Sequence, residues 1–373
     1  MTDAEAIRRA VLAAPDADLP RLVYADWLDE YGPELPGPDG ETAADRAAVI
    51  RAQVESARHD PFSPAARAAG EQAAGLLGRH HHTWTRHLGM LGDRAEFTRG
   101  FVGLVEVEAG RFADAAGAAF AAEPVHAVRV RRARSADPWE PLDAVFDCPH
   151  LRRVTTLEIP AATMLYLEYV ALAASPHLAG LRTLSLHGNP VPPQWLTDFI
   201  AGPQLPALTG LDLSDIPNLG PAVAAGLARA GDRRFTRLDL SGVYFRSGDL
   251  QQVLASRCLE GVEELRLGWG GPADGPLTFL NLGWVMPWGR LRALDISGHG
   301  VGPEGVREVV RAAEAAGLRA LGLAANGLGA EGAALLAAPS ALDLYHLDVR
   351  RNDLRPPAVA ALRHRFPDAV VLA

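Results

Sequence analysis

From about residue 150 onward, one pattern of apolar positions recurs along the chain: Leu-x-x-Leu-x-Leu, followed by small or polar residues. The leucines at its fourth position recur at intervals of about 27 residues, and the interval from Leu265 to Leu294 is slightly longer than the others. An apolar pattern that keeps its register over eight copies indicates stacked repeats. These leucines are Leu157, Leu184, Leu211, Leu238, Leu265, Leu294, Leu321 and Leu347.

Each repeat combines two periodicities. The Leu-x-Leu core alternates with a period of two, which predicts a short strand with one buried face. The stretch after it has helical periodicity, most clearly at 303–317 and 330–341. One strand and one helix cannot cover their own apolar faces, so the units must stack side by side. The pattern predicts an α/β solenoid with parallel strands on the inside of a curve and helices on the outside.

The residues between strand and helix predict how neighbouring repeats are joined. Asn189, Asn326 and Asn352 stand where a side-chain amide can bond the backbone of an adjacent repeat. In other repeats we expect Asp215 or small residues at this place, which leaves the ladder of amides incomplete. Pro303 suits the first turn of the helix that follows.

The interval of about 27 residues and the phrase L-x-x-L-x-L…N-x-L/V-x-x-E-G resemble the ribonuclease-inhibitor type of leucine-rich repeat. The resemblance covers about residues 150–373 and implies a horseshoe with parallel inner strands and outer helices. Terminal units of such arrays differ from the rest, and we expect 366–373 to supply a last strand that closes the open edge.

Upstream, AIRRAVLAAPDADLPRLVYADWLDEYG (6–32) resembles a repeat-companion domain that precedes such repeats in large bacterial paralogous families. RAAVIRAQ (46–53) and FTRGFVGLVEV (97–107) resemble its continuation. The resemblance carries no assigned biochemical role. We expect 31–42 to form an exposed loop, since it is rich in proline and glycine. The matching positions are Pro15, Asp16, Asp18, Leu22 to Leu28 and Gly32.

These patterns divide the chain into three predicted segments. Residues 1–95 form the helical repeat-companion domain, and 43–92 are expected to be helical and rich in alanine. Residues 96–150 form irregular first repeat units, with strands at 102–107 and 126–132 and a helix at 110–124 between them. Residues 151–373 form the leucine-rich repeat array with its closing strand.

Composition excludes several classes of protein. The 373 residues contain no apolar run long enough for a membrane span, and the N-terminal residues lack the apolar core of a signal peptide. The net charge of -9 argues against a phosphate-driven nucleic-acid binder. Cys148 and Cys258 are the two cysteines, too few for a disulfide framework or a four-cysteine zinc site. We therefore expect a cytoplasmic protein.

The inner face of the solenoid is the first candidate for a binding surface. The residue between the two strand leucines points there, because side chains alternate along a strand. Asp212 and Asp239 should lie about 4.8 Å apart on neighbouring strands. A basic partner would relieve their repulsion; alternatively, the short acids only keep the strands soluble. In order the eight residues are Glu158, Ser185, Asp212, Asp239, Arg266, Asp295, Gly322 and Asp348.

The second candidate is the irregular segment 268–290, which replaces a regular helix in the longest interval between repeats. It holds Trp269, Phe279, Trp284 and Trp288. Aromatic side chains on an irregular loop can anchor a partner. They can equally fill the outer core where the helix is missing.

Other clusters favour structural roles. His80, His81 and His82 cannot face one way on a helix, and no cysteine or paired acid stands at metal-ligand spacing beside them. We expect them at an exposed helix end. Asp26 and Glu30 share the solvated face of a packed helix, and Asp26 is expected to cap the helix or pair with an arginine such as Arg21 or Arg51. No P-loop, nucleotide-binding, metalloprotease, hydrolase or kinase motif is present.

We therefore predict a protein- or peptide-binding module without chemistry of its own, acting as an adaptor, inhibitor or substrate-presenting subunit. We expect no enzyme activity, cofactor, metal, nucleic acid or membrane partner. One alternative is an enzyme or accessory with its site in the N-terminal segment 1–150. Another is self-assembly, in which Arg129, Arg131, Arg132 and Arg134 meet the acidic face. The predicted partner-binding residues are Glu158, Asp212, Asp239, Arg266, Asp295, Asp348, Trp269, Trp284 and Trp288.

Overall fold

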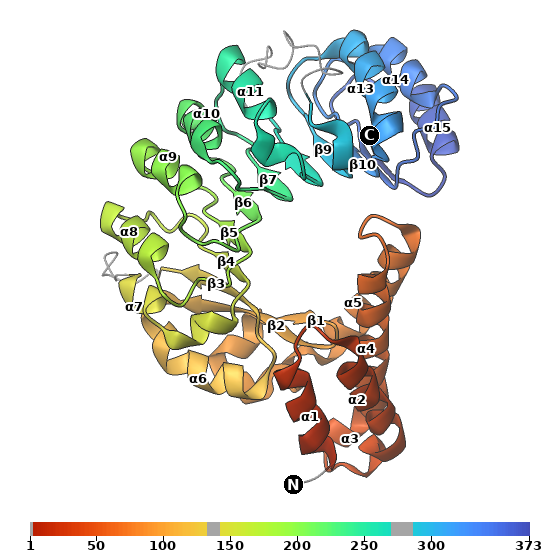
Figure 1. Cartoon of the computed structure of the whole chain (residues 1–373). Helices are drawn as coiled ribbons and strands as arrows, with labels where there is room; N and C mark the ends of the chain where they lie inside the picture. The colour runs from red at the N-terminus through yellow and green to blue at the C-terminus, as the bar shows by residue number, and fades with distance from the viewer. Residues whose placement is uncertain (1–2, 133–141, 270–285) are drawn as a thin grey trace. The chain divides into compact units, whose positions relative to one another are not determined.

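The computed structural model describes residues 3–132, 142–269 and 286–373 and is shown in Figure 1. The chain divides into two compact units. The first unit comprises Met1–Glu158 and Ser175–Gly180, and the second comprises Ile159–Ala174 and Leu181–Ala373. The segments predicted from the sequence at 1–95, 96–150 and 151–373 stay predictions.

Helices form the first part of the first unit. Ser63 caps α5, because its Oγ accepts a hydrogen bond from the backbone N of Ala66 at 3.1 Å. The helices bury Val11, Ile50 and Phe101 in one core. They are α1 (Asp3–Ala13), α2 (Asp18–Tyr31), α4 (Ala43–Arg58), α5 (Pro64–Thr85) and the 3₁₀ segment η2 (Arg86–Arg94).

The expected exposed loop at 31–42 is wrong in part. Two short helices lie there, η1 (Gly32–Glu34) and α3 (Pro38–Glu41). A proline in the first turn fixes the backbone of η1. Gly32 is buried, and a Cβ on it would overlap the Cβ of Ala43. Most residues of the segment are exposed as expected, whereas Gly32 packs against the start of α4.

The strands of the first unit confirm the two predicted irregular strands and the helix between them. β1 (Glu96–Thr98) pairs antiparallel with β2 (Phe101–Glu108), which pairs parallel with β3 (Ala127–Arg131), and β3 pairs parallel with β4 (Thr156–Glu158). α6 (Phe112–Ala122) lies between β2 and β3 in the chain. The remaining short helices are η3 (Ala109–Arg111), α7 (Asp143–Phe146) and η4 (Pro149–Arg153).

Replacing Gly100 with alanine is expected to lower the free energy of unfolding by about 2 kcal/mol. Gly100 has a φ of +82°, and a Cβ there would overlap Cγ1 of Ile50. Gly75 is the matched control, because it lies in α5 with open space around it, so alanine there should slightly stabilise the helix. Urea denaturation followed by circular dichroism measures both. Equal midpoints for the two variants would contradict this assignment.

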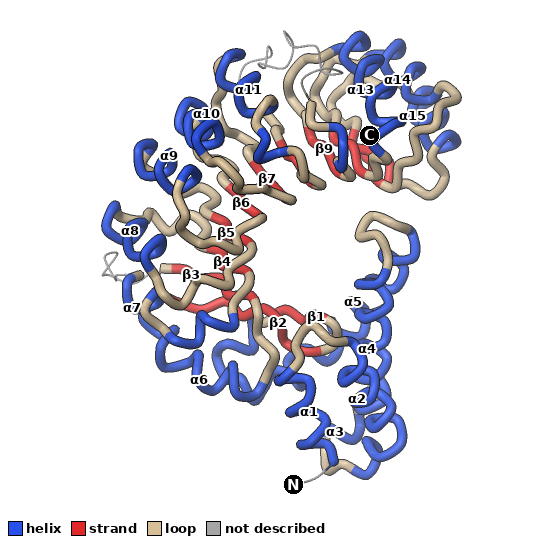
Figure 2. Tube along the Cα trace, in the orientation of Figure 1, coloured by secondary structure: helices blue, strands red, loops and turns tan. Residues whose placement is uncertain are grey.

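Eight strands of the second unit form a parallel ladder in chain order (Figure 2), each bonded to the next. The repeat leucines pair with one another, as Leu184 does with Leu211. The predicted closing strand is confirmed, since β12 pairs with β11. The strands are β5 (Thr183–Ser185), β6 (Gly210–Asp212), β7 (Arg237–Asp239), β8 (Glu264–Arg266), β9 (Ala293–Asp295), β10 (Ala320–Gly322), β11 (His346–Asp348) and β12 (Val370–Leu372).

Helices lie along one side of this ladder, as Figure 2 shows. The helices predicted at 303–317 and 330–341 are confirmed as α13 and α14, and Pro303 lies in the first turn of α13. The second unit is thus an α/β repeat with a parallel sheet. Its helices are α8 (Tyr166–Ala174), α9 (Pro193–Ala201), α10 (Gly220–Arg229), α11 (Ser247–Leu254), α13 (Gly302–Ala316), α14 (Gly329–Ala337) and α15 (Pro356–Arg365), with short η5 (Arg257–Leu259) and η7 (Trp288–Arg290).

Buried asparagines join neighbouring repeats, as predicted. Asn326 Oδ1 accepts a hydrogen bond from the backbone N of His299 at 3.0 Å, and its Nδ2 donates to the carbonyl of Ile296 at 2.9 Å. Asn352 makes the same two kinds of contact to the repeat before it, and so does Asn189. Each amide satisfies backbone groups that would otherwise be buried without a partner.

The expectation that Asp215 fills this place is wrong. The register puts Ile216 there, five positions after Leu211, and Ile216 is buried whereas Asp215 is exposed. His299 fills the place in its own repeat, where its ring Nε2 donates to the carbonyl of Leu267 at 2.7 Å. An imidazole thus replaces the carboxamide at one step of the ladder.

Candidate functional site

The residues between the strand leucines form one continuous row in the second unit, which we call the strand row. Register pairs each of them with its counterpart on the next strand. Since the leucines are buried, the intervening side chains point to the other face of the sheet. The strand row consists of Ser185, Asp212, Asp239, Arg266, Asp295, Gly322 and Asp348.

The aspartates of the strand row are held by their own backbone. In each case one carboxylate oxygen accepts a hydrogen bond from the backbone N two residues later, at 2.9 Å for Asp212, 3.0 Å for Asp239, 2.9 Å for Asp295 and 3.1 Å for Asp348. This Asx turn ends the strand and fixes the carboxylate. The motif Asp-x-Ser, which recurs in three repeats, is the sequence signal from which this turn could have been predicted.

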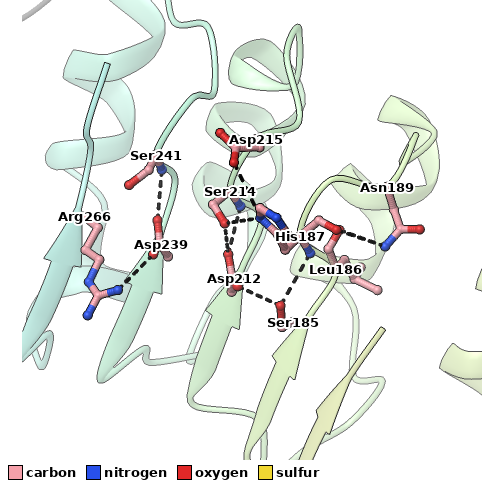
Figure 3. A network of polar contacts seen from close by, with 10 residues as sticks. All are labelled: Ser185, Leu186, His187, Asn189, Asp212, Ser214, Asp215, Asp239, Ser241 and Arg266. Atoms are coloured by element: carbon pink, nitrogen blue, oxygen red, sulfur yellow. Dashed lines mark hydrogen bonds and ion pairs between the residues drawn. The ribbon is translucent and has the colours of Figure 1, made fainter. Parts of the chain in front are cut away.

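Asp212 and Asp239 are neighbours in register, but Asp212 contacts a residue of the preceding strand and Asp239 a residue of the following strand (Figure 3). Ser185 Oγ donates to Asp212 at 2.6 Å, whereas Asp239 forms an ion pair with Arg266 at 3.5 Å. Burial raises the pKa of Asp239, and the charge of Asp212 raises it further. The backbone therefore brings two like charges together, and their hydrogen bonds reduce the repulsion without removing it.

Only some of the aspartates in the strand row form ion pairs. Asp348 pairs with Arg350 at 2.6 Å. Within the described ranges, no arginine or lysine lies at ion-pair distance from Asp212 or Asp295. A Cβ on Gly322 would lie 2.5 Å from Oδ1 of Asp295, so the glycine leaves room for that carboxylate over the next strand. Asp212 and Asp295 are therefore the aspartates of the strand row whose charge is not compensated by an ion pair.

A serine, a histidine and two aspartates meet at one end of the row. His187 Nδ1 lies 2.9 Å from Ser214 Oγ and 3.8 Å from Asp215, and Ser214 Oγ donates to Asp212 at 2.6 Å. In a catalytic triad the histidine uses opposite ring nitrogens for the serine and the acid. Here both contacts fall on Nδ1, so this is a hydrogen-bonded surface network and not a nucleophile with its base.

The two described tryptophans of the predicted loop, Trp269 and Trp288, contact residues other than those of the strand row. Trp269 is half-buried between Tyr244 and His299, with ring centroids 5.4 Å and 6.3 Å away. Trp288 begins η7 and lines a recess of about 300 Å³ together with residues at the end of α11. Phe279 and Trp284 lie outside the described residues.

Glu158 belongs to the first unit, where it pairs with a predicted assembly residue. Arg129 donates to Glu158 at 2.6 Å, and Arg131 pairs with Glu106 at 2.9 Å. Both arginines are thus compensated by acids of their own unit. Arg134 lies outside the described residues.

Two further predictions concern the helices of the first unit. The expected pairing of Asp26 is confirmed with Arg51, at 2.7 Å. Arg21 is instead buried and donates to backbone carbonyls. His80 of α5 bonds Asp45 of α4 at 2.6 Å, and the described residues contain no group of three or more His, Cys, Asp or Glu side chains that could hold a metal ion.

The alternative of an enzymatic site in the segment 1–150 directs attention to Glu123, whose side chain is 1% exposed. Burial opposes its ionisation, but the hydrogen bond from His87 and the charges of Arg8 and Arg46 outweigh burial and lower its pKa. A carboxylate held ionised in this way does not serve as a general acid.

Comparison with known proteins does not assign this chain to a family. It matches no family model and no curated protein. None of the helices in the described ranges combines the length and apolar character that crossing a membrane requires. Among solved structures, the chain is similar to one in the crystal structure of the Rad7 and Elc1 complex in yeast, with a TM-score of 0.41 and 13% identity over 67% of this chain and 75% of that one. A likeness of that size carries no argument about function.

Proposed function

We propose that the strand row of the second unit binds a polypeptide segment carrying lysine or arginine, and that the chain performs no chemistry of its own. It would act as an adaptor, an inhibitor or a substrate-presenting subunit. The observation that supports this is the in-register row of polar side chains, four of seven of them aspartate, on the sheet face opposite the buried leucines.

We also propose that the repeats are leucine-rich repeats of the ribonuclease-inhibitor type, arranged as a horseshoe, and that they follow a bacterial repeat-companion domain in the sequence. The parallel strands at intervals of about 27 residues, the asparagine ladder and the helices on one side of the ladder support this. Cys148 and Cys258 are free and buried, in keeping with the proposed cytoplasmic location.

The distance between two aspartates of the strand row predicts the separation of the basic residues in the partner. Asp212 on β6 and Asp295 on β9 are three strands apart, which is about 14 Å at the usual strand separation. Two residues four positions apart in an extended peptide span about 13 Å. A segment that crosses the strands with basic residues four positions apart therefore meets both carboxylates that have no ion pair of their own.

Replacing Asp212 and Asp295 together with asparagine is expected to weaken binding of such a peptide about tenfold. Asparagine keeps an oxygen for the Asx turn, so the loss is mainly charge. The probe is a fluorescein-labelled glycine peptide with three lysines at every fourth position, and fluorescence anisotropy of the full chain at low ionic strength measures the affinity.

The matched control removes the same charge from the helices. Asp198 on α9 and Glu331 on α14 are exposed, so Asp198→Asn with Glu331→Gln should change the affinity less than twofold. A peptide with glutamate in place of lysine should not bind. Equal affinity of the two double variants for the lysine peptide would refute recognition by the strand row.

A further inference from the structure

A recess of about 420 Å³ opens in the first unit, apart from the strand row. Side chains from α1, α2, α4 and α5 contribute to its wall, together with one residue that follows α6. The wall combines aromatic rings with charged groups, a composition typical of pockets for small ligands. The residues that matter here are Arg8, Tyr24, Trp27, Arg46, Trp84 and Glu123.

The carboxylates of the recess already have cationic partners. Glu123 accepts from Arg8 at 3.2 Å and from the backbone N of Val102 at 3.1 Å, and it lies 3.1 Å from His87. Asp39 pairs with Arg86 at 2.7 Å. Three arginines and two carboxylates stand among the described lining residues, and Arg46 is the arginine that forms no ion pair with either carboxylate, although its charge acts on both.

Arg46 is 8% exposed, and its Nη1 has no hydrogen-bond partner in the described part of the chain. Its guanidinium carbon lies 4.8 Å from the ring centre of Trp84 and 4.6 Å from that of Phe97, so aromatic faces hold it in place. Burial lowers its pKa to about 10, which leaves it charged at neutral pH. A buried cation with an unused donor destabilises the fold unless a partner accepts its hydrogen bond and balances its charge.

We infer that this recess binds a monoanionic carboxylate attached to an aromatic or branched apolar group. The guanidinium of Arg46, a residue that lines the recess, donates to the carboxylate, whose single charge balances the arginine without an ion pair. Tyr24, Trp27 and Trp84 contact the apolar part. The indole N–H of Trp84 already donates to Thr42 at 2.9 Å, so Trp84 contributes only apolar ring atoms to the wall of the recess. A phosphate dianion would leave a surplus negative charge in the recess.

Two sources can supply this chemistry: a free aromatic acid or the C-terminal residue of a polypeptide. Isothermal titration calorimetry of the full chain uses 3-indolepropionate for the first and Gly-Gly-Ala-Phe with a free carboxyl terminus for the second. We expect the amide of each probe to bind at least tenfold more weakly than the acid. If only the peptide acid binds, the source is a polypeptide terminus. If the free acid binds as tightly as the peptide, the source is a small molecule.

Arg46→Met keeps the length and aromatic contacts of the side chain but removes its charge, and we expect it to weaken the acid about tenfold or more. Arg51→Met on the same helix is the matched control, since Arg51 pairs with Asp26 on the surface, and it should not change the affinity. Should Arg46→Met fail to fold, Trp27→Leu at the half-buried wall tests the apolar contact, with an expected loss of about fivefold.

The inference is overturned if acids and amides bind equally, if neither acid binds, or if inorganic phosphate binds more tightly than the acids. Loss of lysine-peptide binding to the strand row would leave these results unchanged, so the two proposals fail separately.

Discussion

Replacing Asn326 with alanine is expected to lower the free energy of unfolding of the second unit by about 3 kcal/mol. The side chain is fully buried and joins two repeats. Without this side chain, two buried backbone groups lose their hydrogen-bond partner. They are the N–H of His299, which donates to Asn326 at 3.0 Å, and the carbonyl of Ile296, which accepts from it at 2.9 Å. Each buried backbone group without a partner costs about 1–3 kcal/mol.

Equilibrium urea denaturation of the full chain, followed by circular dichroism, measures this change. Asn218→Gly is the matched control, because Asn218 is an exposed asparagine of the same unit with a φ of +66° that glycine adopts freely. It should shift stability by less than about 0.5 kcal/mol. If Asn326→Ala behaved like this control, the ladder would not be what couples neighbouring repeats.

The regular part of the fold could be predicted because its information is local and repeated. Leu184 and Leu211 stand one repeat apart in the sequence and pair in the structure, so spacing alone fixes which residues share a row. The same spacing predicts that Asp212 and Asp239 are neighbours. It cannot predict where their carboxylates point, because Ser185 and Arg266 draw them in opposite directions through contacts across strands.

The failures have specific physical causes. Asp215 was assigned to the ladder because it is polar, whereas the buried place in that repeat is filled by apolar Ile216. His299 was missed because it is not an amide, although its ring reaches the corresponding carbonyl of the preceding repeat.

The recess of the first unit was out of reach for another reason. Arg8, Arg46 and Glu123 come from three distant segments, and no local pattern shows that folding brings them to one cavity.

Acidification is expected to destabilise the second unit through His299. Burial lowers its pKa to about 4, although the hydrogen bond to the Leu267 carbonyl and the charge of Asp295 act in the opposite direction. In the unfolded chain the pKa returns to about 6.5. Between these values the unfolded state binds more protons, so stability is fully present above pH 6.5 and is lost as pH falls toward 4. A difference of this size amounts to about 3 kcal/mol.

His299→Gln separates this effect from other titrations, because glutamine can still donate to the Leu267 carbonyl but carries no titrating group. His126 in the first unit, whose pKa burial also lowers, contributes equally to both proteins and cancels in the difference. Urea midpoints measured from pH 7.5 down to pH 4 should therefore converge, because the variant is the less stable protein at neutral pH but does not lose stability through protonation of this side chain. Parallel curves over this range would mean that His299 is protonated as easily in the fold as in the unfolded chain, and the ladder would then tolerate a charge at this step.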